Sequence, residues 1–191
     1  NTSNVALIVT TAPLLTAFIA NFTLKNEPLK RHTFLGSIIA LGGVFLIVFN
    51  GNFILQLNPA GDLLSFFSAL SWAIYSILIK KISHQYPVLF TTRRVFFYSI
   101  LTLLPWFCYE PLPLDFSILL QKEVIFNLLF LSLIASSLCF YIWNIIIKNL
   151  GAVHTNNYIY FISIVTLFVS WLVLDEKITA YALLGAVLIL S

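Results

Sequence analysis

Residues 4–48 read NVALIVTTAPLLTAFIANFTLKNEPLKRHTFLGSIIALGGVFLIV, and this stretch decides the fold. Two apolar runs flank a charged turn at residues 25–32, and each run approaches the length of about 20 residues that a bilayer-spanning helix needs. The first run contains Pro13, and the second contains Gly36, Gly42 and Gly43. Because backbone groups in lipid must form hydrogen bonds within their own segment, both runs predict helices rather than strands.

A weaker copy of this pattern lies near the other end of the chain. There the charged turn at residues 175–179 leads into the apolar run at residues 183–187. A shift of 149 positions places Glu27 on Glu176 and Gly36 on Gly185. We interpret the two stretches as copies of one internal repeat.

The composition is that of an integral membrane protein. Hydrophobic residues make up 60% of the chain, charged residues only 9%, and the mean hydropathy is +0.99. In a soluble domain about a quarter of the residues are charged. The chain contains no methionine, and its last apolar run, 179–191, is too short to cross a bilayer. We therefore expect a fragment that lacks both ends.

The apolar runs predict an all-α membrane bundle with seven helices. The seven expected helices cover residues 4–24, 33–49, 61–79, 88–108, 124–147, 152–174 and 179–191. The connections between them are short and rich in Gly, Pro and Asn, as is typical of turns.

The distribution of charge predicts the orientation of the helices. Eight of the ten basic residues lie beside the odd-numbered connections, whereas six of the seven acidic residues lie beside the even-numbered ones. Since cytoplasmic loops carry an excess of Lys and Arg, the turn at Glu27 is expected in the cytoplasm and the turn at Glu176 outside. The two copies of the repeat would then be inserted in opposite senses, which is typical of secondary transporters.

Several segments, taken in order, resemble the EamA-type proteins of the drug/metabolite transporter superfamily. The resemblance rests on Pro13, Glu27, Gly36 and the Gly42–Gly43 pair, on residues 61–65 and 69–75, on residues 141–144 and 150–152, and on residues 175–178 with Gly185. These segments look like helices four to ten of that family's ten.

This resemblance implies a carrier built from two inverted five-helix repeats, with residues 1–52 ending the first repeat and residues 61–191 forming the second. It also implies export of a small metabolite, such as an amino acid, across a bacterial inner membrane. Ser163 lies where the second repeat of the family usually has a proline matching Pro13. We therefore expect less kinking in the helix at residues 152–174.

Polar residues on one face of an apolar helix point toward protein or toward a cavity. Such stripes occur on the helices at 61–79, 124–147 and 152–174. We expect these faces to line a substrate cavity of aromatic and neutral hydrogen-bonding groups. The candidate substrate-binding residues are Thr10, Trp72, Tyr75, Ser136, Asn144, Asn156 and Tyr160.

Other interpretations remain open at this stage. The same Ser, Thr and Asn residues would also join helices in a membrane scaffold that transports nothing. Seven spans fit a receptor, although no lysine lies at mid-membrane to carry retinal. An intramembrane enzyme is disfavoured because no span has an ionisable residue at its centre. We expect no catalytic residues, no metal site, no cofactor and no nucleic-acid partner, while the sequence leaves the oligomeric state open.

Overall fold

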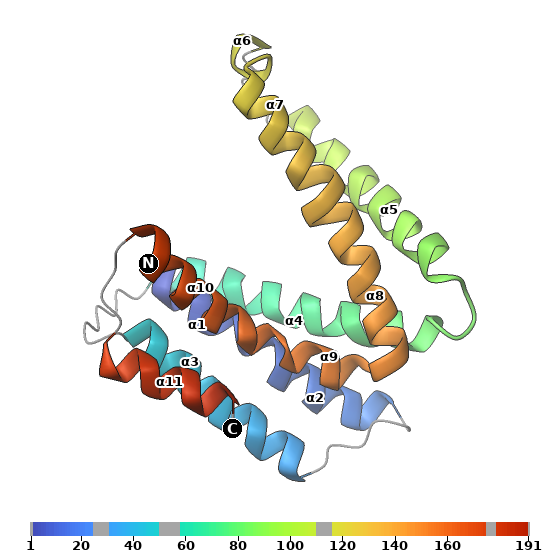
Figure 1. Ribbon diagram of the computed structural model, residues 1–191. Helices are drawn as coiled ribbons and strands as arrows, with labels where there is room; N and C mark the ends of the chain where they lie inside the picture. Colours follow the sequence, from blue (N-terminus) through green and yellow to red (C-terminus); the bar gives the residue numbers. More distant parts are fainter. Residues whose placement is uncertain (1, 25–30, 50–57, 110–115, 175–178, 191) are drawn as a thin grey trace. The chain divides into compact units, whose positions relative to one another are not determined.

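The computed structural model describes residues 2–24, 31–49, 58–109, 116–174 and 179–190, and every element in these ranges is a helix (Figure 1). The turns that hold Glu27 and Glu176 lie outside the described residues. The chain forms two units. Unit 1 comprises residues 1–81 and 150–191, and unit 2 comprises residues 82–149.

Six stretches of the described chain are long and apolar enough to cross a membrane. They cover residues 5–23, 31–48, 59–82, 88–107, 122–150 and 152–173, and a shorter apolar helix covers residues 180–190. These seven segments match the seven predicted from the sequence, so the all-α membrane fold is confirmed. Two of them, however, are not continuous helices.

Unit 1 begins with a broken helix. Helices α1 (Thr2–Val9) and α2 (Ala12–Thr23) are separated by a turn at Thr10 and Thr11. Each threonine hydroxyl donates a hydrogen bond to the carbonyl three residues earlier, at 2.8 Å for Thr10 and 2.6 Å for Thr11. Pro13 has no N–H to donate and begins a helix readily. The expected single helix at residues 4–24 is therefore wrong, because the proline and the two threonines break it.

The helix expected at residues 152–174 is also broken, at Tyr158, into α9 (Ala152–Asn157) and α10 (Ile159–Leu174). This interruption lies five residues before Ser163, and α10 runs as one helix through Ser163. The hydroxyl of Thr155 donates to the Gly151 carbonyl at 2.6 Å, and the Asn156 amide donates to the Ala152 carbonyl at 2.9 Å. Such side-chain bonds to the preceding turn bend helices without a proline.

The remaining helices of unit 1 are α3 (Arg31–Phe49), α4 (Pro59–Ile82) and α11 (Ala180–Leu190). Helix α4 is capped by Asn58, whose side-chain oxygen accepts from the Gly61 N–H at 3.3 Å. Pro59 at its first position is preorganised for the helix. The start of α4 is therefore fixed by local sequence.

Helices α3 and α11 run side by side in opposite directions (Figure 1). They touch where two glycines face each other. A Cβ atom on Gly43 would lie 2.5 Å from the carbonyl oxygen of Gly185, and a Cβ on Gly185 would likewise meet the carbonyl oxygen of Gly43. The missing side chains at this pair therefore let the two helix backbones approach closely. Gly36, by contrast, has no neighbour within 4 Å of such an atom.

A second contact in unit 1 joins α2, α4 and α9. Ala17 and Ala20 of α2 pack with Ile77 of α4 and Val153 of α9, and all four side chains are buried. Small residues allow helix backbones to approach closely, and this packing drives helix association in membranes. The contact places the polar residues of α4 and α9 next to each other.

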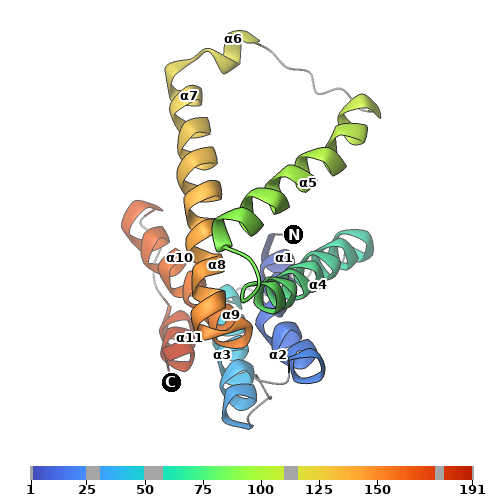
Figure 2. The ribbon, with the colours of Figure 1, turned by 90° about the vertical axis from the view of Figure 1, so that its right-hand side faces the viewer.

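Unit 2 contains α5 (Val88–Tyr109), the short α6 (Phe116–Leu119), and a long stretch made of α7 (Lys122–Leu129), η1 (Phe130–Leu138) and α8 (Cys139–Leu150). Figure 2 shows α5 and this long stretch meeting near the start of α5 and diverging from there. Segment η1 is a π-helix, in which the Cys139 N–H donates to the carbonyl of Ile134, five residues earlier. The helix expected at residues 124–147 is present within the span at residues 122–150, and nine of its residues form this π-helical segment.

Candidate functional site

Three of the seven candidate residues lie together in unit 1. The indole N–H of Trp72 on α4 donates a hydrogen bond to the side-chain oxygen of Asn156 on α9 at 2.9 Å. The ring of Tyr75 lies one helical turn further along α4, with its centroid 5.6 Å from that of Trp72. We call Trp72 and Asn156 the indole–amide pair.

Asn156 is completely buried, and its position on α9 is held from both sides. Its amide nitrogen donates to the Ala152 carbonyl, while its oxygen accepts from Trp72. This arrangement fixes the direction of the amide, because each of its two ends has a suitable partner. It also leaves the Asn156 oxygen facing α4, where it binds a donor.

Thr10 lies at the break between α1 and α2. Its hydroxyl is turned back to the Leu7 carbonyl, and the side chain is only partly buried. Both broken helices of unit 1 carry a candidate residue at or beside the break, since Asn156 lies two residues before Tyr158. Interrupted membrane helices form substrate and ion sites in secondary transporters, because they free backbone groups for a ligand.

Tyr160 has different neighbours from Asn156, although the two are four residues apart. It is only 2% exposed and packs against Ala40 and Val44 of α3. Its hydroxyl has no hydrogen-bond partner within the described part of the chain. Tyr160 also lines a cavity of about 500 Å³ together with His154 and the hydrogen-bonded pair Ser37 and Asn157, whose oxygens are 3.2 Å apart.

The last two candidates belong to unit 2. The amide of Asn144 on α8 donates to the hydroxyl of Thr92 on α5 at 2.9 Å, and both side chains are buried. Ser136 is partly buried in the π-helix η1. Segments of π-helix within α-helices occur frequently at functional sites.

Sequence reasoning missed three polar residues that the structure places at these sites. Thr92 is the partner of Asn144, and Ser37 is the partner of Asn157. Thr92 stands in the polar run at residues 91–94, and Ser37 lies four residues after Thr33, but neither belongs to the polar stripes on the helices at 61–79, 124–147 and 152–174. Within the described ranges, no three His, Cys, Asp or Glu side chains gather to hold a metal ion.

Comparisons with known proteins show the family to which the chain is related. The model of the EamA-like transporter family matches residues 59–191. The chain belongs to this family. Its members are transporters rather than enzymes, so the predictions of an EamA-type membrane protein and of a non-enzyme are both confirmed.

Three relatives cover nearly the whole chain. The uncharacterized transporters YyaM and YoaV of Bacillus subtilis (strain 168) are 30% and 26% identical over 98% and 96% of this chain. A protein of Escherichia coli (strain K12), named a probable amino-acid metabolite efflux pump, is 25% identical over 97% of it. The chain spans 61%, 62% and 64% of the lengths of YyaM, YoaV and the Escherichia coli protein.

Proposed function

We propose that the protein is a secondary transporter that exports a small metabolite, an amino acid or a similar compound, across the bacterial inner membrane by alternating access. The observation that carries this proposal is the indole–amide pair. It brings a buried amide and an aromatic donor together between two helices of a membrane-spanning unit. Aromatic walls with a few placed polar groups are the usual composition of small-molecule sites.

The chemistry of the pair favours a ligand with a hydrogen-bond donor. The Asn156 oxygen accepts one hydrogen bond from the Trp72 indole in the state described. An ammonium group carries three donors and would replace the indole N–H at that oxygen. The nearby rings of Trp72 and Tyr75 would attract the same cation through their faces. The name of the Escherichia coli relative, an amino-acid metabolite efflux pump, agrees with a ligand of this class.

In alternating access, two parts of the protein move against each other so that one central site opens first to one side of the membrane and then to the other. We assign residues 1–52 to the end of a first repeat and residues 61–191 to a second repeat inserted in the opposite sense. Helices α3 and α11, which are equivalent by the shift of 149 positions, pack against each other in opposite directions. Equivalent helices would meet in this way beside a twofold axis in the membrane plane.

Solute counterflow tests the transport proposal without knowledge of direction or coupling ion. Proteoliposomes are loaded with one unlabelled amino acid at high concentration, and a trace of the same labelled compound is added outside. We expect a transient accumulation of label for at least one amino acid, because a carrier exchanges solute across the membrane. Liposomes without protein are the control. If no amino acid produces an overshoot, the scaffold interpretation is favoured instead.

Cysteine labelling tests the inverted repeat. Single cysteines are placed beside Arg31 and beside Lys177, in a chain whose Cys108 and Cys139 are replaced by serine. We expect an impermeant maleimide added to intact cells to label the position beside Lys177 only, because the excess of basic residues puts Arg31 in the cytoplasm. Labelling of both positions from the same side would exclude oppositely inserted repeats.

A further inference from the structure

Unit 2 contains a groove of its own, and Thr92, the partner of Asn144, is one of the residues that line it. It has a volume of about 580 Å³ and lies between the first turns of α5 and the η1–α8 stretch. Its lining is mainly apolar and aromatic, with Arg93 among its members. The lining residues used below are Phe90, Arg93 and Phe96 on α5 and Ser137 and Tyr141 on the facing stretch. We call it the interfacial groove.

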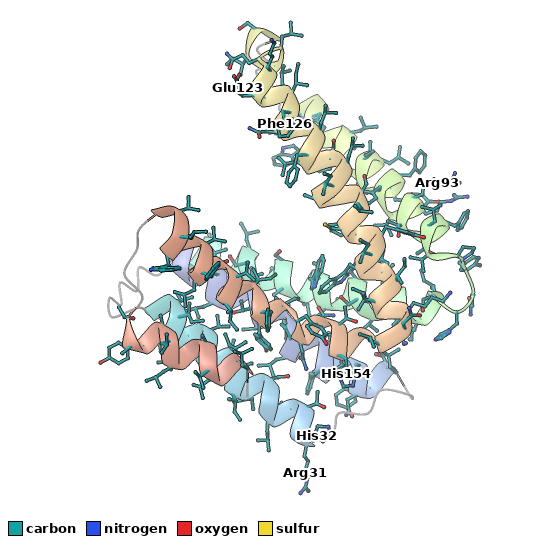
Figure 3. All side chains as sticks on the ribbon, in the orientation of Figure 1. Arg31, His32, Arg93, Glu123, Phe126 and His154 are labelled. Atoms are coloured by element: carbon teal, nitrogen blue, oxygen red, sulfur yellow. The ribbon has the colours of Figure 1, made fainter. Side chains whose placement is uncertain are left out.

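Arg93 lines this groove, and Arg94 is the next residue on α5. The guanidinium carbons of Arg93 and Arg94 lie 5.9 Å and 5.1 Å from the centroid of the Phe90 ring. Both side chains are exposed, and neither forms an ion pair with a carboxylate in the described ranges. Glu123, the acidic residue that the structure describes in unit 2, begins α7, whereas Arg93 lies near the start of α5 (Figure 3). Within the described residues, no carboxylate therefore neutralises these two charges, and Arg94 donates a hydrogen bond to the Tyr98 hydroxyl at 3.4 Å.

The position of the arginines along α5, close to the start of the helix, is typical of residues at a membrane interface. Helix α5 begins at Val88, so Arg93 lies about 8 Å along its axis, at a rise of 1.5 Å per residue. The ring of Tyr86, just before the helix, stacks on Phe90 with centroids 6.1 Å apart. Aromatic rings gather at the headgroup level of membranes, and arginine side chains extend toward it. The groove then continues from the headgroups into the hydrocarbon.

We propose that the interfacial groove binds one anionic glycerophospholipid. Its phosphate would bind Arg93 and Arg94, since guanidinium groups bind phosphate oxygens in pairs. One acyl chain would lie in the groove against Phe90 and Phe96, which are separated by almost two helical turns. A free phosphate would satisfy the arginines but would leave the apolar walls unfilled. The charge and the apolar walls together select a lipid.

Native mass spectrometry of the purified full chain tests this proposal. The protein is incubated with phosphatidylglycerol or with phosphatidylcholine of identical acyl chains. We expect selective retention of phosphatidylglycerol, and a loss of about tenfold or more in the variant Arg93→Gln/Arg94→Gln. The matched control is Arg31→Gln/Lys122→Gln, which removes the same charge from the exposed starts of α3 and α7. Equal losses in the two variants would overturn the site, because they would indicate non-specific attraction.

A second variant keeps both arginines and fills the groove. Ser137 lines the groove on the wall opposite α5, and its hydroxyl donates a hydrogen bond to the Ser132 carbonyl at 2.8 Å. The substitution Ser137→Phe replaces this small side chain by an aromatic ring that occupies the groove. We expect this variant to lose phosphatidylglycerol while far-UV circular dichroism stays unchanged. Unchanged retention would show that no acyl chain occupies the groove, and displacement of the lipid by soluble glycerol phosphate would identify a simple anion site. Either result overturns the proposal.

Discussion

Replacing Gly43 by alanine is expected to destabilise the protein by about 2 kcal/mol or more, because the added methyl group has no space. It would lie 2.5 Å from the Gly185 carbonyl oxygen and 3.2 Å from the backbone nitrogen of Ile189. These are backbone atoms, so no change of rotamer on α11 relieves the overlap. The two helices would have to move apart and lose the contact that joins them.

Gly42 supplies the matched control. It is the neighbouring residue on α3, and a Cβ atom there meets nothing within 4 Å. Gly42→Ala should therefore leave stability unchanged or raise it by about 0.5–1 kcal/mol, since alanine is the better helix former. Both variants are compared by unfolding in mixed micelles with increasing SDS, followed by circular dichroism. Equal midpoints for the two variants would show that α3 and α11 do not pack through Gly43.

The number and order of the membrane segments were predictable from the sequence, because the length and apolar character of a run decide whether it crosses a bilayer. The break in the first segment was only partly predictable. Pro13 indicated that the helix would be bent or interrupted nearby. The turn itself lies at Thr10 and Thr11, whose hydroxyls donate hydrogen bonds to backbone carbonyls of the preceding turn. Nothing comparable marks Tyr158. That break depends on side-chain bonds from Thr155 and Asn156 to the preceding turn, and such bonds have no simple sequence signal.

The sequence indicated which polar and aromatic residues were candidates, but it did not indicate their hydrogen-bond partners. A buried Trp or Asn in an apolar helix needs a hydrogen bond, so Trp72, Asn144 and Asn156 stand out in the sequence. Their hydrogen-bond partners depend on tertiary packing between distant segments of the chain. Trp72 and Asn156 are 84 residues apart in the sequence, and Asn144 and Thr92 are 52 residues apart. Asn156 and Tyr160 come from the same predicted helix, yet they have different neighbours in the structure. The break at Tyr158 lies between them, and Tyr160 packs against α3.

The variant Trp72→Phe is expected to lower the counterflow rate per folded molecule by about tenfold, a result that depends on the proposed transport activity. Phenylalanine keeps the aromatic ring but removes the N–H that, in the state described, holds the Asn156 oxygen in the direction from which an ammonium group would bind it, at 2.9 Å. Hydrogen bonds between membrane helices contribute roughly 0.6–2 kcal/mol, which corresponds to a factor of about 3–30. Asn156→Leu removes the other partner. Because Asn156→Leu breaks this bond and also removes the oxygen proposed to bind the ligand, the double variant should be little slower than Asn156→Leu alone.

Trp171→Phe is the matched control for the loss of an indole. Trp171 lies on α10 with 47% of its surface exposed, and its ring packs against Phe168. This variant should transport at the original rate, because lipid-facing indoles contribute to anchoring rather than to the site. If the pair only joins helices, Trp72→Phe should be less stable but should transport at an unchanged rate per folded molecule. Rates are therefore normalised to the protein that remains folded in the liposomes. If the original protein shows counterflow and Trp72→Phe transports at the same normalised rate, the indole–amide pair is not part of the site, although the transport proposal still stands.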